Sequence, residues 1–247
     1  MKRNTRIVFA IACLALAALA CQAMNTGGNP TSEPNVPPNI DNTDVPAPTS
    51  APVNQGGGDV VFKDDFSSQG NPWGTGTDAD SSVEYDNETL RIKVFTKNYI
   101  VWTTPPKDKD YEKVHVEVTA NTNGSDSTTA FGVLCDQQVI TSTYYYFAIT
   151  PDGDYAIAKA ALAQTDVFLT NGDQWAKSDL ITKNASSYRI GADCGNGNLT
   201  LYVDGKEIVS ASDSTYTGGG VGVINWSGQD SVLADITFDD FAVTTLP

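Results

Sequence analysis

The chain has 247 residues, of which 30 are acidic, 15 are Lys or Arg and one is His, so its formal net charge is −15 at pH 7. A negative excess of this size excludes a nucleic-acid partner, whose binding needs a positively charged surface, and disfavours adsorption of the folded part to anionic lipid. The length leaves room for one domain with a sizeable core.

Residues 1–20 have the pattern of a secretory signal peptide. Three basic residues precede an apolar run, residues 7–19, that is too short to span a bilayer stably. The run ends in Ala18-Leu19-Ala20-Cys21, which resembles the lipobox of bacterial lipoproteins. The resemblance implies cleavage before Cys21, acylation of its sulfur, and an exported chain that a lipid anchors to the bacterial cell membrane. Ordinary secretion with an unmodified Cys21 is the alternative.

Residues 21–58 form a predicted tether. The segment after Cys21 holds seven of the chain's twelve prolines, no Lys or Arg, and mostly Asn, Thr, Ser and Gly otherwise. It offers too little apolar surface to offset the entropy of ordering, so we expect disorder with extended proline-rich pieces. Such a segment would hold the folded domain, residues 59–247, away from a lipid surface.

Residues 59–247 read as short strands with no convincing helix. Leu199, Leu201 and Val203 alternate with polar or aromatic residues, and Asp204-Gly205 predicts a tight hairpin turn. The same period of two predicts strands over 60–66, 82–85, 90–95, 99–102, 111–119, 128–135, 143–149, 155–161, 188–194, 199–203, 206–211, 221–226 and 233–243. A two-sheet antiparallel β-sandwich is therefore the predicted fold.

Two cysteines of this domain stand at similar places in their strands. Cys135 ends the apolar run that begins at Phe131, and Cys194 ends the run that begins at Tyr188. Disulfides persist in exported proteins, so we expect these two residues to pair. Two buried free thiols are the alternative.

The C-terminal half carries a resemblance to a known fold. The run NLTLYVDGKEIVSASDSTYTGGGVGVI, residues 198–224, is followed by ADITFDDFAV, residues 234–243. This order is similar to concanavalin A-like (laminin G-like) jelly rolls, in particular those of bacterial surface lipoproteins and of domains related to 3-keto-disaccharide hydrolases. The resemblance covers about residues 60–245 and implies an all-β jelly roll, a fold that hosts lectins, hydrolases, lyases and adhesion modules.

The sequence predicts no catalytic residues. Laminarinases and lichenases of this fold carry Glu-x-Asp-x-Glu on one strand, and Glu84-Tyr85-Asp86-Asn87-Glu88 matches that spacing. However, Asp86-Asn87-Glu88 predicts a turn between two strands, so the three carboxylates would not share a face. His115 is predicted to point outward beside Glu117 as a solvated residue with no partner that the sequence identifies.

Aromatic residues predict a carbohydrate-binding face. Trp102, Trp175 and Trp226 are candidate stacking platforms, and Tyr144 and Tyr146 share the strand parity opposite to the core-like Tyr145. Asn225 is a candidate polar partner at the same strand end. Each of these aromatics could instead pack in the core or a loop.

The interpretation that follows is a lipid-anchored surface module that binds a glycan or another surface polymer without turning it over. A carbohydrate-active hydrolase on the same fold and a structural or protein-binding envelope lipoprotein are the alternatives.

Calcium is the one cofactor that the resemblance suggests. Some jelly rolls of this type hold a structural calcium ion with an Asp on the final strand and groups near the first strand. Asp240 matches that final-strand position, and Asp65 would lie beside it if the two end strands pair. The alternative is that these acids are edge-strand charges that discourage aggregation.

Overall fold

The computed structural model describes residues 57–106, 110–229 and 233–247. The predicted signal peptide, Cys21 and nearly all of the predicted tether lie outside the described residues. Within the described part, no helix has the length and apolar character needed to cross a membrane.

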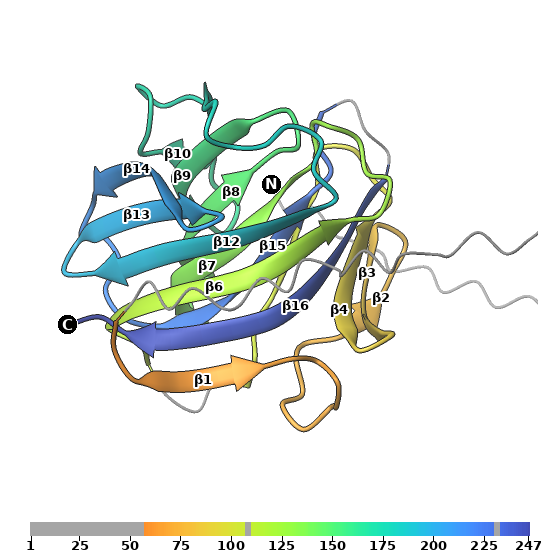
Figure 1. The fold of residues 1–247 in the computed structure, drawn as a ribbon, viewed down its shortest axis with the longest axis horizontal. Helices are drawn as coiled ribbons and strands as arrows, with labels where there is room; N and C mark the ends of the chain where they lie inside the picture. The colour runs from red at the N-terminus through yellow and green to blue at the C-terminus, as the bar shows by residue number, and fades with distance from the viewer. Residues whose placement is uncertain (1–56, 107–109, 230–232) are drawn as a thin grey trace, which may run out of the picture. The chain divides into compact units, whose positions relative to one another are not determined.

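Two antiparallel sheets make up the domain (Figure 1). Sheet A has nine strands, in the order β14 (Lys206–Ser212), β13 (Asn198–Val203), β12 (Ser187–Gly195), β6 (Lys113–Thr122), β16 (Ala234–Thr245), β4 (Thr89–Val94), β3 (Ser81–Asp86) and β2 (Gly76–Thr77), with β1 (Val60–Asp64) pairing to β16. Sheet B has seven, in the order β10 (Val167–Phe168), β9 (Asp154–Ala161), β8 (Thr143–Ile149), β7 (Ala130–Gln138), β15 (Gly220–Trp226) and β5 (Ile100–Thr103), with β11 (Ala176–Lys177) pairing to β9. The predicted all-β sandwich is confirmed.

The core lies between the sheets because alternate residues of each strand point inward. In β6 these are Val114, Val116 and Val118, and in β8 they are Tyr145 and Phe147, all of which are buried in the main hydrophobic cluster. Figure 1 shows β12, β6 and β16 in front of β7, β8 and β15, so the two sets of side chains meet in the layer between. Burial of these apolar groups is the dominant stabilising contribution to the fold.

Two-residue hairpins occur where the sequence predicted tight turns. Asp204 and Gly205 have φ values of 49° and 75° between β13 and β14. Asn87 and Glu88 have φ values of 48° and 62° between β3 and β4. Positive φ at both positions gives the turn twist that suits antiparallel strands. The pairing of β3 with β4 then continues in register, whereas the pairing of β13 with β14 shifts between Leu201 and Tyr202.

The last strand changes its inward parity at a bulge. Ile236 and Phe238 face the core, but after the irregularity between Asp239 and Ala242 the inward residues are Phe241 and Val243. Asp240 has a φ of 50° there. One extra residue flips the alternation, and it lets β16 pair with β4 along its first half and with β1 along its second.

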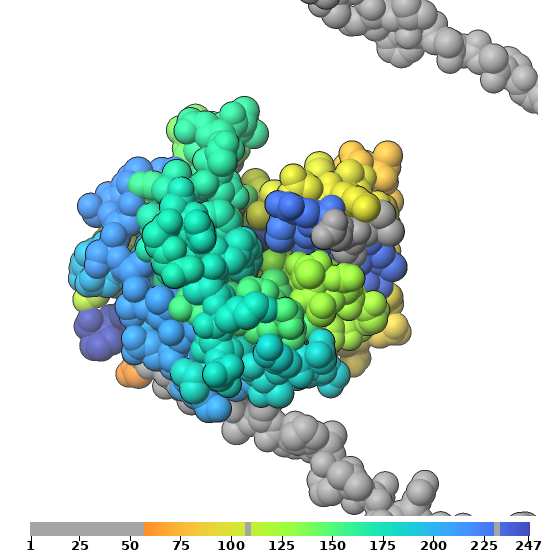
Figure 2. All heavy atoms as spheres, turned by 90° about the horizontal axis from the view of Figure 1, so that it is seen from above, coloured from red at the N-terminus to blue at the C-terminus, as the bar shows by residue number. Residues whose placement is uncertain are grey.

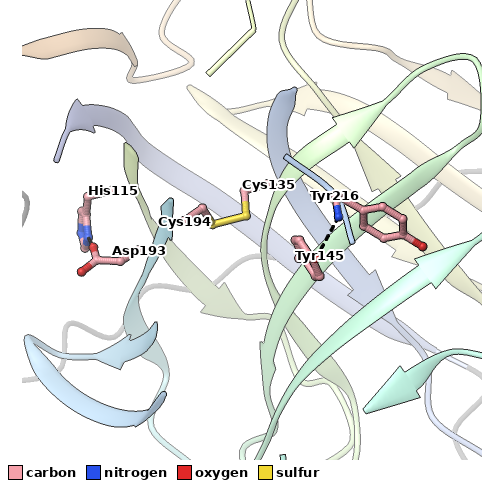
Figure 3. The surroundings of a disulfide bond; sticks show 6 residues. All are labelled: His115, Cys135, Tyr145, Asp193, Cys194 and Tyr216. Atoms are coloured by element: carbon pink, nitrogen blue, oxygen red, sulfur yellow. Dashed lines mark hydrogen bonds and ion pairs between the residues drawn. A yellow bond between two sulfur atoms is a disulfide. The ribbon is translucent and has the colours of Figure 1, made fainter. Parts of the chain in front are cut away.

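Cys135 and Cys194 form the predicted disulfide, which joins β7 of sheet B to β12 of sheet A. Figure 3 shows the bond lying between the two strands, with Tyr145 nearby on the core side. The disulfide therefore connects the two sheets covalently through the core. Beside it, the hydroxyl of Tyr145 donates a hydrogen bond to Asp213 (2.5 Å) and accepts one from the backbone N–H of Tyr216 (3.0 Å).

Candidate functional site

A second apolar cluster covers the outer face of sheet B. It is built from the residues whose parity is opposite to the core, among them Tyr144, Tyr146 and Ala148 of β8 and Ile224 of β15. Small residues (Ala130, Ala158 and Ala160) leave its floor low, and aromatic side chains pack around them. The predicted split of Tyr144 and Tyr146 from Tyr145 is therefore what the fold produces.

A groove of about 520 Å³ lies on this face. Its lining combines aliphatic and aromatic groups with amides and one carboxylate: Asn98, Ile100, Ala130, Tyr146, Ala148, Gln164, Thr165, Asp166, Phe168, Trp175, Ile224, Trp226 and Gln229. Figure 2 looks onto the molecule from above and shows a hollow between the teal segment on one side and the yellow and blue segments on the other. An open groove of this composition suits an extended ligand with both apolar and hydroxyl-bearing surfaces.

Three tryptophans predicted from sequence lie on this outer face. Trp175 and Trp226 stack with a centroid separation of 6.1 Å and an interplanar angle of 13°, and Phe168 packs against Trp175 at 5.7 Å. Trp102 packs against Tyr144 at 5.7 Å. Trp175 and Trp226 line the groove and keep part of their surface exposed there. Trp102 and Tyr144 belong to the same outer cluster but are not among the residues that line the groove.

The polar groups of the groove come mostly from the segment between β9 and β10. The hydroxyl of Tyr146 donates to the Asp166 carboxylate at 3.0 Å. Burial raises the pKa of Asp166, and the hydrogen bond from Tyr146 offsets part of that rise. Burial also raises the pKa of Tyr146 well above its ordinary value, so this hydroxyl remains a neutral donor.

Asn225 does not reach the groove, contrary to the sequence prediction. Its side chain is fully buried and donates to the backbone carbonyls of Ile92 (2.9 Å) and Ala234 (3.4 Å) of sheet A. Neighbouring residues of a strand point to opposite faces, so Asn225 and Trp226 cannot serve the same surface. Asn225 instead connects the two sheets through the core.

The Glu84–Glu88 motif is a hairpin, as predicted, and holds its carboxylates apart. Glu84 pairs with Lys93 (3.1 Å), Asp86 pairs with Arg91 (2.5 Å), and Glu88 occupies the turn. Among the described residues, Asp166 is the one carboxylate that lines the groove. Glycoside hydrolysis ordinarily requires two carboxylates facing each other across the scissile bond, and the described lining does not supply that pair.

His115 is buried rather than solvated, which corrects the sequence prediction. It does point to the outer side of sheet A, but it is 1% exposed, and its Nδ1 lies 2.7 Å from Oδ1 of Asp193 (Figure 3). Tyr202 packs edge-on against the ring at 5.7 Å, and Gly191 leaves room for it, because a Cβ there would lie 2.9 Å from the imidazole.

A partner for His115 therefore exists in Asp193. Burial disfavours the charged imidazole, but the carboxylates of Asp193 and Glu117 outweigh this and raise the pKa of His115. Arg189 pairs with Glu117 at 2.8 Å, so the charges of this cluster balance locally. Since the ring is covered, the cluster holds strands β6, β12 and β13 together and is not open to a substrate.

Asp65 and Asp240 do come close to one another, because β1 pairs with β16 and sets Asp64 opposite Phe241. Both line one shallow depression, into which Arg189 donates a hydrogen bond to the backbone carbonyl of Asp240 (2.7 Å). Within the described ranges, no group of three or more His, Cys, Asp or Glu side chains is arranged to hold a metal ion.

Sequence reasoning missed Asp166, Gln164 and Phe168 of the groove. They belong to a loop and to a strand of two residues, Val167–Phe168, so no alternating pattern marks them. The available signal was their position shortly before Trp175 in the chain, between two predicted strands.

The sequence matches no family model, and no curated protein matches it. Solved structures do match the fold. The carbohydrate-binding module CBM66 from Bacillus subtilis has a TM-score of 0.55 at 12% identity, over 71% of this chain and 96% of that one. A laminarinase from Flavobacterium sp. UMI-01 has 0.53 at 12%, over 76% and 100%. A glycoside hydrolase family 16 endo-glucanase from Bacteroides ovatus has 0.50 at 13%, over 74% and 99%. At such identities the likeness concerns the fold, a concanavalin A-like jelly roll.

Proposed function

We propose that this chain is a carbohydrate-binding module whose site is the groove on the outer face of sheet B. The observation that carries the proposal is the aromatic wall of Trp175 and Trp226 above a floor of alanines, with amides at the rim. Sugar rings present apolar C–H faces that pack on aromatic rings and hydroxyls that bond to amides. The carbohydrate-binding and glycan-active proteins of the same fold support this class of ligand.

The proposed module is non-catalytic. The lining of the groove, in the ranges that the structure describes, provides one carboxylate, whereas the hydrolytic chemistry of glycosidases ordinarily uses two. A hydrolase on the same fold is the second candidate function, and the laminarinase and the family 16 endo-glucanase that share the fold favour it.

The test is calorimetric titration of residues 59–247 with a panel of neutral polysaccharides, beside an assay for released reducing ends. These residues contain both sheets and the whole core, so the domain is suited to study alone. Trp226→Ala and Trp175→Ala should each weaken binding at least tenfold, or about 1.4 kcal/mol. Phe95→Ala is the matched control, because Phe95 is 40% exposed and does not line the groove. Equal affinity in all three variants would exclude the groove as the site, and released sugar would favour the hydrolase.

Two further parts of the proposal concern the context of the domain. Acylation of Cys21 would anchor the exported chain, and residues 22–58 would tether the module at a distance from the membrane. A structural calcium ion at Asp65 and Asp240 is also proposed, with the resemblance as its main support. Calorimetric titration with calcium of the domain, after a chelator has removed bound metal, tests this site. If Asp240→Asn binds calcium as the wild type does, the ion does not bind at Asp240.

A further inference from the structure

The groove lacks positive charge. Among its lining residues Asp166 is the one charged group, and none is Lys, Arg or His. Lys97 is next to Asn98 in sequence but is not part of the lining. A carboxylate that is partly buried loses part of its favourable hydration free energy. A cation bound beside it would compensate for much of that loss by electrostatic attraction.

The Asp166 carboxylate has room for such a partner. Its Oδ2 accepts a hydrogen bond from the hydroxyl of Tyr146 at 3.0 Å, and no Lys, Arg or His of the described residues acts on the Asp166 carboxylate. The neighbouring acid Asp173 differs, because its carboxylate accepts the backbone N–H of Phe168 at 2.7 Å and so holds the loop. Of these two acids, Asp166 therefore has a carboxylate oxygen, Oδ1, that can accept a hydrogen bond or an ion pair from a ligand in the groove.

The aromatic side chains of the groove also favour a cationic ligand. Phe168, Trp175 and Trp226 line the groove together with Tyr146. A cation near the face of an aromatic ring is attracted by the ring's quadrupole, and Trp is the most effective ring for this. An ammonium group in the groove would thus share one space with a carboxylate and several aromatic rings.

The net charge of the whole domain also favours a cationic ligand. Residues 59–247 contain 27 acidic and 12 basic side chains. The resulting field attracts a cationic polymer and repels polymers that carry carboxylate, sulfate or phosphate groups.

We infer that the groove prefers a glycan that carries ammonium groups, a polymer of 2-amino-2-deoxy sugars without N-acetyl groups, and that Asp166 determines this preference. The inference rests on the proposed carbohydrate-binding function and names its ligand class. It assigns to Asp166 a binding role only, with no bond made or broken.

Three oligosaccharides with one linkage and one length test the inference: the β-1,4-linked hexamers of glucosamine, N-acetylglucosamine and glucose. They differ only at carbon 2, which carries an ammonium, an acetamide or a hydroxyl group. Titrations at about pH 6 keep the amine protonated, and moderate salt screens the long-range field. We expect the glucosamine hexamer to bind about tenfold more tightly than the other two, and we expect Asp166→Asn to remove that difference without weakening the neutral hexamers.

Asp179→Asn is the matched control, because it makes the same change in charge at an exposed residue that does not line the groove. Its preference for the glucosamine hexamer should be unchanged, and thermal unfolding of each variant checks that the fold is intact. Polylysine serves as a second probe: if it competes with the glucosamine hexamer equally well in the wild type and in Asp166→Asn, general charge attraction explains the binding and the inference is wrong.

The same titrations distinguish the preference for ammonium groups from the proposed carbohydrate-binding function. Equal binding of the three hexamers, or binding of other neutral glycans alone, overturns the preference and leaves a glycan-binding groove. If no glycan of either panel binds, both are overturned together.

Discussion

At the scale of single residues, two positions hold conformations or charges that their side chains do not favour. Glu88 has a φ of 62°, a region in which a side chain with a Cβ is strained. Asp136 is 5% exposed, and its Oδ1 has no hydrogen-bond partner in the described structure. Both residues lie outside the groove. Substitutions that relieve the strain at Glu88 or the charge burial at Asp136 should therefore change the free energy of unfolding and leave ligand affinity unchanged.

Glu88→Gly should stabilise the domain by roughly 0.5–1 kcal/mol, because glycine accepts the positive φ and Asn-Gly is a favoured hairpin turn. Urea denaturation measures the change. Asn87→Gly, at a φ of 48°, should gain less, since Asn tolerates this region better than Glu. A loss of stability in Glu88→Gly would mean that the Glu88 side chain makes a contact that outweighs its backbone strain.

Asp136→Asn should stabilise the domain at pH 8 and have little effect at pH 4. Burial raises the pKa of Asp136 to about 7, although the backbone N–H of Gly218 lowers it in part. Because the folded pKa lies above the unfolded one, the associated stability is complete below about pH 4 and is lost as the pH rises toward 7. The expected gain at pH 8 is on the order of 1–3 kcal/mol.

Asn also tolerates the φ of 52° at position 136, so the backbone should not interfere with this comparison. Unfolding free energies of the two proteins, measured from pH 4 to pH 9, give the test. A constant difference across that range would show that charge burial is not the cause, and Asp179→Asn controls for net charge.

At the scale of elements, alternation within a strand explains both what the sequence predicted and what it did not. The pattern separated Tyr144 and Tyr146 from Tyr145, and Asp204-Gly205 marked a hairpin, because both depend on local geometry. The same rule, applied more strictly, would have separated Asn225 from Trp226.

Other features depend on neighbours that are distant in sequence. The alternation places His115 on the outer side of its strand, as the structure does, but it does not show that this side is covered. The strands that bring Asp193 and Tyr202 to His115 are far along the chain. The reversal of parity in β16 comes from a single extra residue in the ladder, which periodicity alone does not mark. Asp166 lies in a loop whose path is fixed by packing on sheet B, so no local pattern could place it in the groove.

The disulfide between β7 and β12 is the element-scale contribution to stability that is easiest to remove. Cys135 and Cys194 are 59 residues apart, and closing a loop of that length in the unfolded chain corresponds to about 4 kcal/mol in the entropic treatment. The double variant Cys135→Ala, Cys194→Ala should lose about 3–4 kcal/mol in urea denaturation. Reductant should destabilise the wild type and leave the double variant unchanged; no response of the wild type would contradict the prediction.

At the scale of the whole molecule, the proposed anchor and tether would determine where the groove can reach a glycan. The domain carries a strong negative charge, so it should not adsorb to an anionic membrane by itself. Attachment would then depend on the lipid at Cys21, and residues 22–58 would set how far the groove reaches from the surface.

Cys21→Ser should move the protein from the membrane fraction to the soluble fraction of the producing bacterium, because the acceptor sulfur is lost. Fractionation and immunoblotting measure the distribution, and metabolic labelling with a fatty acid should mark the wild type only. Glycan affinity of the released protein should equal that of residues 59–247. Retention of Cys21→Ser in the membrane fraction would show that attachment does not need the thiol.

The pairing of β1 with β16 has a consequence for chain connectivity. The backbone N–H of Thr245 donates to the carbonyl of Asp59 at 3.0 Å, so the two ends of the folded unit are neighbours. A short glycine linker could therefore join residue 247 to residue 59, and the chain could be reopened between Val139 and Ile140, where the side chains are 58% and 99% exposed. Such a circular permutant should keep both sheets and the groove while moving the point of attachment to another edge of the sandwich, which means that the order of the strands along the chain is separable from the surface that they build.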